Sequence, residues 1–444
     1  MRNSILLTGA TGFLGKVVLQ ELLRNRESLG VHLIFLLIRA TSQNASKVRM
    51  EREIFQSECL EGLTETGEEC VRPIWGDLHK PNLGISEDAL TVMSKNVTQV
   101  IHCAATIGFN STILDSVKTN VDGTLEVFRL TKHFSHRPFF TFVSTAYVHR
   151  VLPQKKFEEK PIILPREARE IYEDIHLKRT SERTLLKETC QANAYTLSKC
   201  LAEHLLIQEA EPGRLQIIRP SIISACLERP FPGWIDSSAG FAGFVAMLGT
   251  GQLRAVPADP KVALNVVPCD VVAQNIVHTS NEGNQDRPMI RQCVASHDSS
   301  CSIDSCRRRI TSYFFENQIT DPPDIRYVGP KGLLFHIADL ALHTIPLLYN
   351  ALIQYIFGDP AKAKQIKTLF KKIQQTNANF SYFTHNDYDF STSLPTIEFA
   401  SESYLTLVCS GVRDHILKRR RLRRKVKRSE NESKVAPPFP KSGL

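Results

Sequence analysis

The stretch Thr8-Gly9-Ala10-Thr11-Gly12-Phe13-Leu14-Gly15 decides the fold of this 444-residue chain. A short apolar run at residues 5–7 precedes it and predicts a buried strand, and apolar residues at helical spacing follow it through residue 23. The glycines therefore lie at a strand-to-helix turn. Gly9 allows the tight turn, Gly12 lets the backbone approach a pyrophosphate, and Gly15 lets the helix pack closely on the sheet. Free amide groups at the helix N-terminus favour phosphates, so we predict a dinucleotide-binding turn.

Further apolar runs extend this unit into an alternating pattern. Residues 31–38, 71–78, 97–105 and 139–143 predict strands, with helical patterns between them, one of which is expected to begin at residues 118–124. This alternation predicts an α/β fold with a doubly wound, mostly parallel sheet. The strand end at Asp77 is expected to lie beside the adenine. Small residues near the end of the next strand, among them Ala104, let the backbone pass close to the cofactor.

Arg39 follows the second predicted strand, at the position where NAD-dependent enzymes carry an acidic residue for the ribose hydroxyls. An arginine there suits a 2′-phosphate instead, through charge-assisted hydrogen bonds. We therefore predict NADPH as the cofactor. The alternative interpretation is that Arg39 is only a solvated charge at a strand end.

Tyr195 and Lys199 stand four residues apart in a predicted helix, so both side chains lie on one face. A tyrosine hydroxyl titrates near pKa ~10, and a neighbouring ammonium lowers that pKa by stabilising the anion. The pair can then act as general acid for a carbonyl that accepts hydride, while a hydroxyl from Ser144-Thr145 holds the substrate oxygen. Alone, the pair more often marks a half-buried aromatic and a surface charge. Together with the glycine turn, it predicts a reductase.

Several segments resemble the extended short-chain dehydrogenases/reductases, and more narrowly the alcohol-forming fatty acyl-CoA reductases. Pro-Gly-Trp-Ile-Asp at residues 232–236 is the most specific of them, because general members of the superfamily lack it. Ala192 and Tyr388 depart from the family pattern, which has a proline and a tryptophan there. The other similar segments are residues 143–147, 193–203, 219–223 and 265–272, within a strong resemblance over about residues 4–280 that continues weakly to residue 413.

The resemblance implies a Rossmann-type fold and NADPH-dependent reduction of a long-chain fatty acyl-CoA to a primary alcohol through a bound aldehyde. Tyr195 would be the acid, and Lys199 would lower its pKa and hold the ribose. Thr145 is preferred over Ser144 as the substrate-binding hydroxyl, and Asn120 would support a water relay to the lysine. The implied cofactor contacts are Gly9, Thr11, Gly12, Phe13, Leu14, Gly15, Arg39, Asp77, Leu78, Ala104, Lys199 and Pro220.

Two other classes of function stay open. One is another extended reductase or epimerase, acting on a sterol or a nucleotide sugar, which the Pro-Gly-Trp-Ile-Asp segment disfavours. The other is a non-catalytic NADPH-binding protein that serves as a membrane scaffold. The intact Tyr195–Lys199 pair disfavours this second class, because a scaffold has no need of an acid and its lysine.

The chain divides by composition. Residues 1–280 are predicted to form the NADPH-binding and catalytic domain, with a charged insertion at residues 151–192 that covers the active site. Residues 281–330 are expected to form substrate-side loops, with a loop and a sheet edge within residues 281–300. Residues 331–412 are expected to form a smaller helical region, and residues 413–444 a basic, disordered tail. Eleven cysteines without a paired framework indicate free thiols in a reducing compartment, and their spacing predicts no metal site.

The net charge of +9 arises in the tail, where residues 413–428 hold ten Lys/Arg and one Asp. Such a run can be a solvated tail, but an anionic membrane surface suits it better. Nucleic acid is not expected as a partner, because interleaved aromatics are missing. No signal-peptide pattern precedes the first strand, so we expect no secretion, but cytosol-facing association with the endoplasmic reticulum or peroxisome.

Leu333–Phe357 is the most apolar stretch, yet it carries His336, Asp339 and His343. A spanning helix needs about 18 or more apolar residues with few or no charges. We therefore predict a segment that lies on the membrane surface. A helix that lines an acyl tunnel and a buried core helix remain alternatives.

Overall fold

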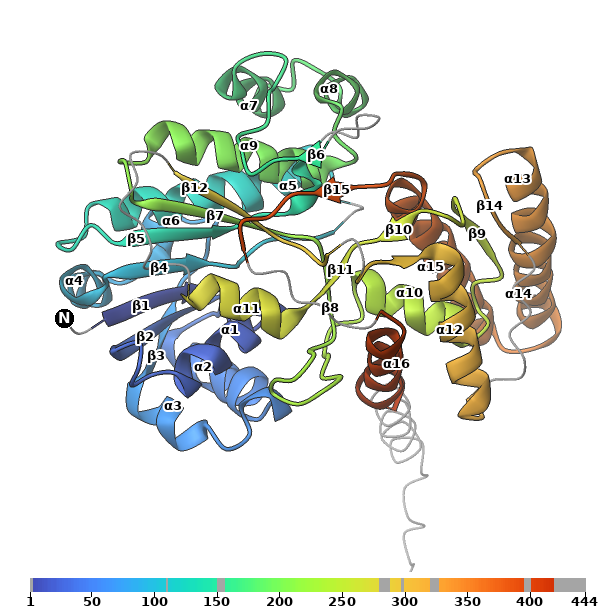
Figure 1. The fold of residues 1–444 in the computed structure, drawn as a ribbon, viewed down its shortest axis with the longest axis horizontal. Coiled ribbons are helices and arrows are strands. Elements are labelled where there is room, and N and C mark those ends of the chain that lie inside the picture. Colours follow the sequence, from blue (N-terminus) through green and yellow to red (C-terminus); the bar gives the residue numbers. More distant parts are fainter. Residues whose placement is uncertain are drawn as a thin grey trace, which may run out of the picture.

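The computed structural model describes residues 3–108, 111–149, 156–278, 288–296, 299–319, 327–394 and 401–418. A seven-stranded sheet forms its centre, with all strands parallel and in the order β12-β7-β5-β4-β1-β2-β3 (Figure 1). This order is that of a doubly wound fold and confirms the predicted fold class. The strands are β1 (Asn3–Thr8), β2 (Val31–Ile38), β3 (Val71–Trp75), β4 (Gln99–His102), β5 (Phe139–Val143), β7 (Leu215–Pro220) and β12 (Met289–Cys293).

Helices cover both faces of the sheet. Successive strand residues point to opposite faces, and here both sets are apolar, so each face must be covered. Ile5 and Leu7 belong to the core under α1 and α11, whereas Leu6 belongs to the core on the other face. Both faces are thus apolar, as a buried parallel sheet requires. The covering helices are α1 (Phe13–Arg24) and α11 (Cys269–His278) on one face, and α4 (Glu87–Asn96), α5 (Ile113–Val117), η4 (Lys118–Asp122), α6 (Gly123–Lys132) and α9 (Ala194–Glu209) on the other.

Shorter elements fill the connections between strands. The helix expected to begin near residue 118 in fact begins at Ile113, and residues 118–122 form a π-helical turn inside it. The fourth strand is also shorter than predicted, because the chain leaves the sheet after His102. The remaining short elements are α2 (Gln43–Met50), η1 (Glu51–Phe55), η2 (Glu58–Leu60), α3 (Thr64–Cys70), η3 (Pro81–Gly84) and η5 (Ala146–Val148).

The insertion predicted at residues 151–192 contains β6 (Lys156–Phe157), α7 (Ala168–His176) and α8 (Glu182–Thr189), while residues 151–155 lie outside the described residues. The sheet edge expected within residues 281–300 is β12, at one edge of the main sheet. The loops predicted for the rest of residues 281–330 are wrong in one place, because α12 (Ile303–Glu316) is a full helix. Ser302 caps α12, and its apolar residues Ile303, Cys306 and Ile310 fall on one buried face.

A third core lies beside the sheet, under the helices of the second half of the chain. In Figure 1 these helices occupy the right-hand side, opposite the sheet. They are α10 (Gly240–Gly249), α12, α15 (Pro360–His385) and α16 (Ser401–Gly411). Four two-stranded sheets lie outside the main sheet. They pair β8 (Ile222–Ser224) with β11 (Val266–Pro268), β9 (Ala255–Pro257) with β14 (Tyr327–Gly329), β10 (Ala263–Leu264) with β13 (Cys301–Ser302), and β6 with β15 (Asp389–Phe390) among the described residues.

The last two predicted regions also have a defined form. Leu333–Phe357 is one run of helix, made of α13 (Leu333–Asp339), η7 (Leu340–Thr344) and α14 (Ile345–Phe357). It is the one described helix long and apolar enough to cross a membrane. Helix also continues past α16 through η8 (Val412–Leu417), beyond the expected start of the basic tail. Residues 419–444 lie outside the described residues.

Candidate active site

The glycine turn joins β1 to α1 with the backbone that a dinucleotide needs. Gly9 has a φ of +76°, and the N–H of Gly12 donates to the carbonyl oxygen of Gly9 at 2.9 Å. A Cβ on Gly15 would lie 2.1 Å from that same oxygen, and one on Gly9 would lie 2.7 Å from the backbone nitrogen of Ala104. Gly12 is the N-cap of α1, and no side chain caps the first turn. This cradle fits a pyrophosphate.

A buried histidine holds the strand ends around that turn, and the sequence did not single it out. His102, at the end of β4, lies 2.9 Å from the Thr8 hydroxyl through Nδ1 and 3.0 Å from the Thr124 hydroxyl through Nε2. The backbone N–H of Ala104 donates to the Thr8 hydroxyl at 3.2 Å. Burial lowers the pKa of His102 to about 3, so the ring is neutral and serves as a brace.

Tyr195 and Lys199 lie on α9, whose N-terminus is fixed by a capping box between Asn193 and Thr196. The Lys199 ammonium is buried, donates to the carbonyl oxygen of Val143 at 2.7 Å and lies 4.5 Å from the Phe142 ring centre. Burial raises the pKa of Tyr195, opposite to the predicted direction. The reason is that the Lys199 ammonium binds the Val143 carbonyl oxygen at the end of β5, so loss of hydration is the main influence on the pKa of Tyr195.

Two hydroxyls lie at the end of β5. Thr145 accepts a hydrogen bond from the N–H of Tyr147 at 3.3 Å and donates to the carbonyl oxygen of Pro220 at 3.5 Å. Ser144 is equally buried, but its hydroxyl has no hydrogen-bond partner among the described residues. The Ser221 hydroxyl, which directly follows β7, also has no hydrogen-bond partner among the described residues. The Ser144 hydroxyl is thus as available to a bound oxygen as the Thr145 hydroxyl preferred from the sequence.

Asn120 lies in the π-helical turn η4 and is fully buried. Its amide group donates to the carbonyl oxygen of Thr106 at 3.1 Å and to the Ser198 hydroxyl at 3.0 Å, and its oxygen accepts from the N–H of Thr106 at 2.9 Å. The side chain therefore braces the loop after β4 against the catalytic helix. A water relay that involves Asn120 stays a prediction.

These groups meet in a cavity of about 400 Å³ between the sheet and the helical half. The Tyr195–Lys199 pair and the Ser144 and Thr145 hydroxyls contribute polar groups to its lining, and most of its other lining side chains are apolar. Ten of the predicted site residues line it: Gly9, Gly12, Phe13, Leu14, Gly15, Ser144, Thr145, Tyr195, Lys199 and Pro220. The sequence missed the residues that close the cavity from other elements, which are Tyr147, Ser221, Ile222, Ile223 and Ile235, and Asn379, Phe380 and Phe383 of α15.

Six predicted residues do not line the cavity. Ala104 and Asn120 support its wall, as described above. Thr11, Arg39, Asp77 and Leu78 lie outside it, on the side where β2 and β3 end. Arg39 is exposed and near Asp77. Burial alone would raise the pKa of the Asp77 carboxyl, but hydrogen bonds from His79 and, to a smaller extent, the charges of His79 and Arg39 outweigh burial and lower this pKa.

A second arginine, which the sequence did not indicate, lies beside Arg39. The Arg49 guanidinium donates to the backbone oxygen of Arg39 at 2.7 Å and to the Thr11 hydroxyl at 3.5 Å, and pairs with Glu53 at 2.9 Å. It comes from α2, ten residues further along the chain. Two arginines therefore flank the glycine turn at the end of β2.

The Pro-Gly-Trp-Ile-Asp segment packs directly on the helix of the glycine turn. The rings of Phe13 and Trp234 are 5.4 Å apart, and the Lys16 ammonium pairs with the Asp236 carboxylate. The segment also packs closely against the end of α16, since a Cβ on Gly411 would lie 1.9 Å from the carbonyl oxygen of Gly233. The segment thus joins the cofactor helix α1 to the C-terminal helix α16.

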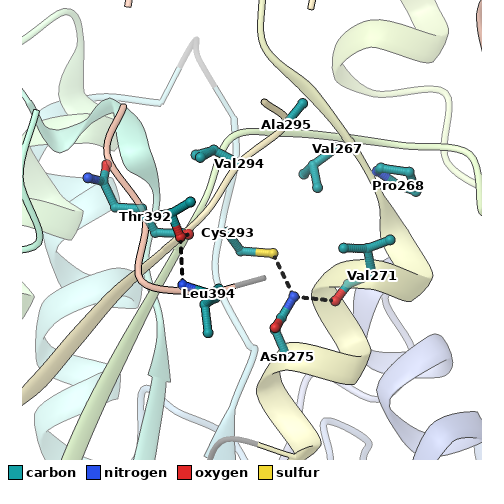
Figure 2. A pocket seen from close by; sticks show the side chains of 10 residues that line it. Val267, Pro268, Val271, Asn275, Cys293, Val294, Ala295, Thr392 and Leu394 are labelled. Carbon is teal, nitrogen blue, oxygen red and sulfur yellow. Dashed lines mark hydrogen bonds between the residues drawn. The ribbon is translucent and has the colours of Figure 1, made fainter. Parts of the chain in front are cut away.

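A second hollow lies near the end of β12, and Figure 2 shows its lining. The amide of Asn275 donates there to the Val271 carbonyl oxygen at 2.9 Å and to the Cys293 sulfur at 3.4 Å. The volume of this hollow is about 10 Å³. It has room for about one water, so it is a packing defect between α11 and residues 392–394 and no substrate site.

The sheet, the glycine turn and the Tyr195–Lys199 pair together define a nicotinamide-dependent oxidoreductase of the extended short-chain type. A family model described as male sterility protein matches residues 7–276, and the chain belongs to that family. The resemblance derived from the sequence is thereby confirmed.

Curated relatives agree with this assignment. Fatty acyl-CoA reductase 1 of Gallus gallus is 29% identical over 408 residues, which cover 89% of this chain and 77% of the relative. A putative fatty acyl-CoA reductase of Drosophila melanogaster is 30% identical over 379 residues, covering 80% and 72%.

Solved structures share the fold. The terminal R domain of the myxalamid PKS-NRPS pathway superposes with a TM-score of 0.62 at 17% identity, over 92% of this chain and 90% of that one. The R domain of a nonribosomal peptide synthetase from Mycobacterium tuberculosis gives 0.59 at 18% identity, over 93% and 92%.

The buried lysine predicts a pH dependence. Burial lowers the pKa of Lys199 to about 8, although nearby Cys103 and Glu203 oppose the shift. If Lys199 holds the cofactor ribose as the resemblance implies, its charged form would donate to the ribose hydroxyl more strongly than its neutral form, so cofactor affinity and kcat/KM should fall as the pH rises through about 8. Fluorescence titrations of the cofactor from neutral to alkaline pH measure this. The Lys199→Arg variant keeps its charge and should lose the inflection; an unchanged affinity through this range in the parent protein would contradict the assignment.

Proposed function

We propose that this protein reduces a long-chain fatty acyl-CoA to the primary alcohol with NADPH, through an aldehyde that stays bound. The observation that carries the proposal is that the Tyr195–Lys199 pair and the glycine turn share one cavity with a wall of Ile222, Ile235 and Phe380. An acyl chain suits that wall, and its carbonyl would then lie at the polar end. The names of the curated relatives support the same substrate class.

The residues of the site divide the work. The bound nicotinamide supplies the hydride for each reduction. Lys199 holds the ribose, and Ser144 or Thr145 donates a hydrogen bond to the substrate oxygen, which orients the carbonyl carbon. Tyr195 gives its proton to that oxygen as negative charge develops on it. Burial favours the neutral tyrosine, so the proton is in place before the reaction.

The atoms balance over two rounds. In the first, the thioester carbonyl gains a hydride on carbon and a proton on oxygen, and the C–S bond of this hemithioacetal then breaks to release coenzyme A as the thiol. The aldehyde left in the cavity gains a second hydride and a second proton and becomes the primary alcohol. Apolar side chains around the chain would retain the aldehyde between the rounds.

The proposed NADPH preference rests on Arg39 and Arg49. Arg39 follows β2, and Arg49 contacts both its carbonyl oxygen and the Thr11 hydroxyl of the glycine turn, so the two arginines could together bind a 2′-phosphate there. We expect Arg39→Ala and Arg49→Ala each to raise the Kd of NADPH by about 10- to 100-fold, the value of a charge-assisted bond. The Kd of NADH should change little.

Isothermal titration of both cofactors checks this preference. Arg52→Ala is the matched control, since Arg52 pairs with the same Glu53 but its side chain is 67% exposed. An unchanged ratio of the two Kd values in both variants would rule out NADPH selection by these arginines.

The substrate is tested by incubating the purified chain with NADPH and a series of acyl-CoAs of increasing length, and identifying products by mass spectrometry. The proposal expects long-chain primary alcohol and free coenzyme A. NADPH binding without consumption of any acyl-CoA would overturn it and favour another extended reductase.

A further inference from the structure

The outer face of Leu333–Phe357 is the largest unexplained apolar surface among the described residues. Only Phe335, His343 and Ala351 are buried in this run. Exposed apolar patches of this extent mark sites of interaction with a partner or a membrane. The exposed apolar side chains run the whole length of these helices and cover most of their surface that faces away from the protein: Leu333 (76% exposed), Leu334, Ile337, Leu340, Ile345, Leu348, Tyr349, Leu352, Ile353, Tyr355, Ile356 and Phe357 (83%).

The inner face of the same helices is tied to the protein along its length. His343 accepts from the N–H of Arg254 at 2.8 Å through Nε2, and its Nδ1 lies 2.8 Å from Asp339. Asp339, the one Asp, Glu, Lys or Arg in this run, also accepts from Gln374 of α15 at 2.8 Å. The polar groups are therefore satisfied against the protein. A helix held this way lies along the surface of the domain, and the core-helix and tunnel-lining alternatives are wrong, since the cavity is lined from α15.

Charge gathers at one end of this face. Four exposed lysines follow Phe357 on the first half of α15: Lys362, Lys364, Lys367 and Lys371. None of them forms an ion pair within the described part of the chain. Lysines beside an apolar face are typical of helices that lie in the interface of an anionic bilayer, where the ammonium groups reach the headgroups.

We propose that α13, η7 and α14 dock flat on an anionic phospholipid bilayer, with the lysines of α15 against the headgroups. Figure 1 shows α13 and α14 in line along the outer right-hand edge, away from the sheet, so a flat surface can reach them. The eleven residues 418–428 include nine Lys/Arg, and this basic run favours the same anionic lipid.

The docked helices also adjoin the cavity. α15 packs along α14 with its first half, and its last turns carry Asn379, Phe380 and Phe383 in the cavity wall. One helix therefore connects the lipid-facing surface to the apolar end of the active site. A long acyl chain, which is poorly soluble in water, would thus meet the enzyme where such chains partition.

Vesicle flotation of the purified full-length chain tests the docking without any need for activity. We expect binding to vesicles of phosphatidylcholine with phosphatidylserine, and weaker binding to phosphatidylcholine alone or at high salt. Leu352→Glu with Ile356→Glu should lower the partition coefficient by about 10-fold or more, since both apolar side chains enter the interface. The control is Ile163→Glu with Leu177→Glu, at residues that are 84% and 59% exposed elsewhere, which should bind as the parent does.

Three results would overturn the proposal. The parent chain could fail to bind anionic vesicles. It could instead form a dimer in light scattering that Leu352→Glu with Ile356→Glu disperses, which would make the face an interface between two copies. Finally, bound protein that resists alkaline carbonate extraction would indicate a spanning helix.

The triple variant Lys362→Gln, Lys364→Gln and Lys367→Gln tests the role of charge. It should lower binding to anionic vesicles by about 10-fold or more, and leave binding to neutral vesicles unchanged.

Discussion

Replacing Tyr195 by phenylalanine should lower kcat/KM for acyl-CoA by about 10²- to 10⁴-fold, the usual worth of a positioned general acid. The ring stays in the cavity wall, and only the hydroxyl that donates the proton is lost. Because Lys199 is held separately by the Val143 carbonyl oxygen, the Kd of NADPH should change little. Steady-state kinetics and a cofactor titration on the same variant measure both quantities.

Tyr147→Phe is the matched control for this variant. Tyr147 lines the same cavity, and its hydroxyl donates to the carbonyl oxygen of Asn265 at 3.4 Å. The substitution therefore removes a hydroxyl from the cavity but leaves the proposed acid, Tyr195, in place. We expect it to retain most of the activity. An equal loss of turnover and NADPH affinity in Tyr195→Phe would instead mean that Tyr195 is structural.

The largest effect on stability is expected at Glu203. Its carboxylate accepts from Nε of Arg219 at 3.0 Å, and the side chains of the pair are 1% and 0% exposed. Arg219 also donates to the carbonyl oxygen of Lys160 at 2.9 Å, so the pair fastens the catalytic helix and the insertion to β7. Glu203→Leu leaves the buried Arg219 guanidinium without an opposite charge, which should lower the free energy of unfolding by about 3–5 kcal/mol.

Chemical denaturation compares this variant with Glu209→Gln on the same helix. Glu209 pairs with Arg129, whose side chain is 49% exposed, and such pairs contribute about 0–1 kcal/mol. The double variant Glu203→Leu with Arg219→Met should recover much of the loss, because no charge is then left unpaired. If Glu203→Leu cost no more than Glu209→Gln, the buried pair would not fasten these elements.

The parts of the fold that the sequence predicted are those set by local pattern. β2 and β5 have the predicted ends, and the glycine turn lies between β1 and α1, because apolar runs and glycines act on their own neighbours in the chain. α12 was missed since Arg307, Arg308 and Arg309 interrupt its apolar pattern, although Ser302 and Ile303 could have indicated its start.

The sequence predicted the site residues that belong to one local motif. It missed those that reach the cavity from segments distant in the sequence. Phe380 and Phe383 enter the cavity from α15, about 180 residues after Tyr195, and Arg49 reaches Thr11 from a neighbouring helix. No local spacing encodes such contacts. The direction of the Tyr195 pKa also depends on burial and on where Lys199 turns, which only the packed structure fixes.

The most direct test of the central claim uses NADPH that carries deuterium at the transferred position of nicotinamide C4, with a long-chain acyl-CoA. The account predicts a primary alcohol with two deuterium atoms on C1, one equivalent of free coenzyme A and two of NADP⁺, formed about 10²- to 10⁴-fold more slowly by Tyr195→Phe. An alcohol or aldehyde without deuterium on C1, or no consumption of acyl-CoA at all, would contradict it.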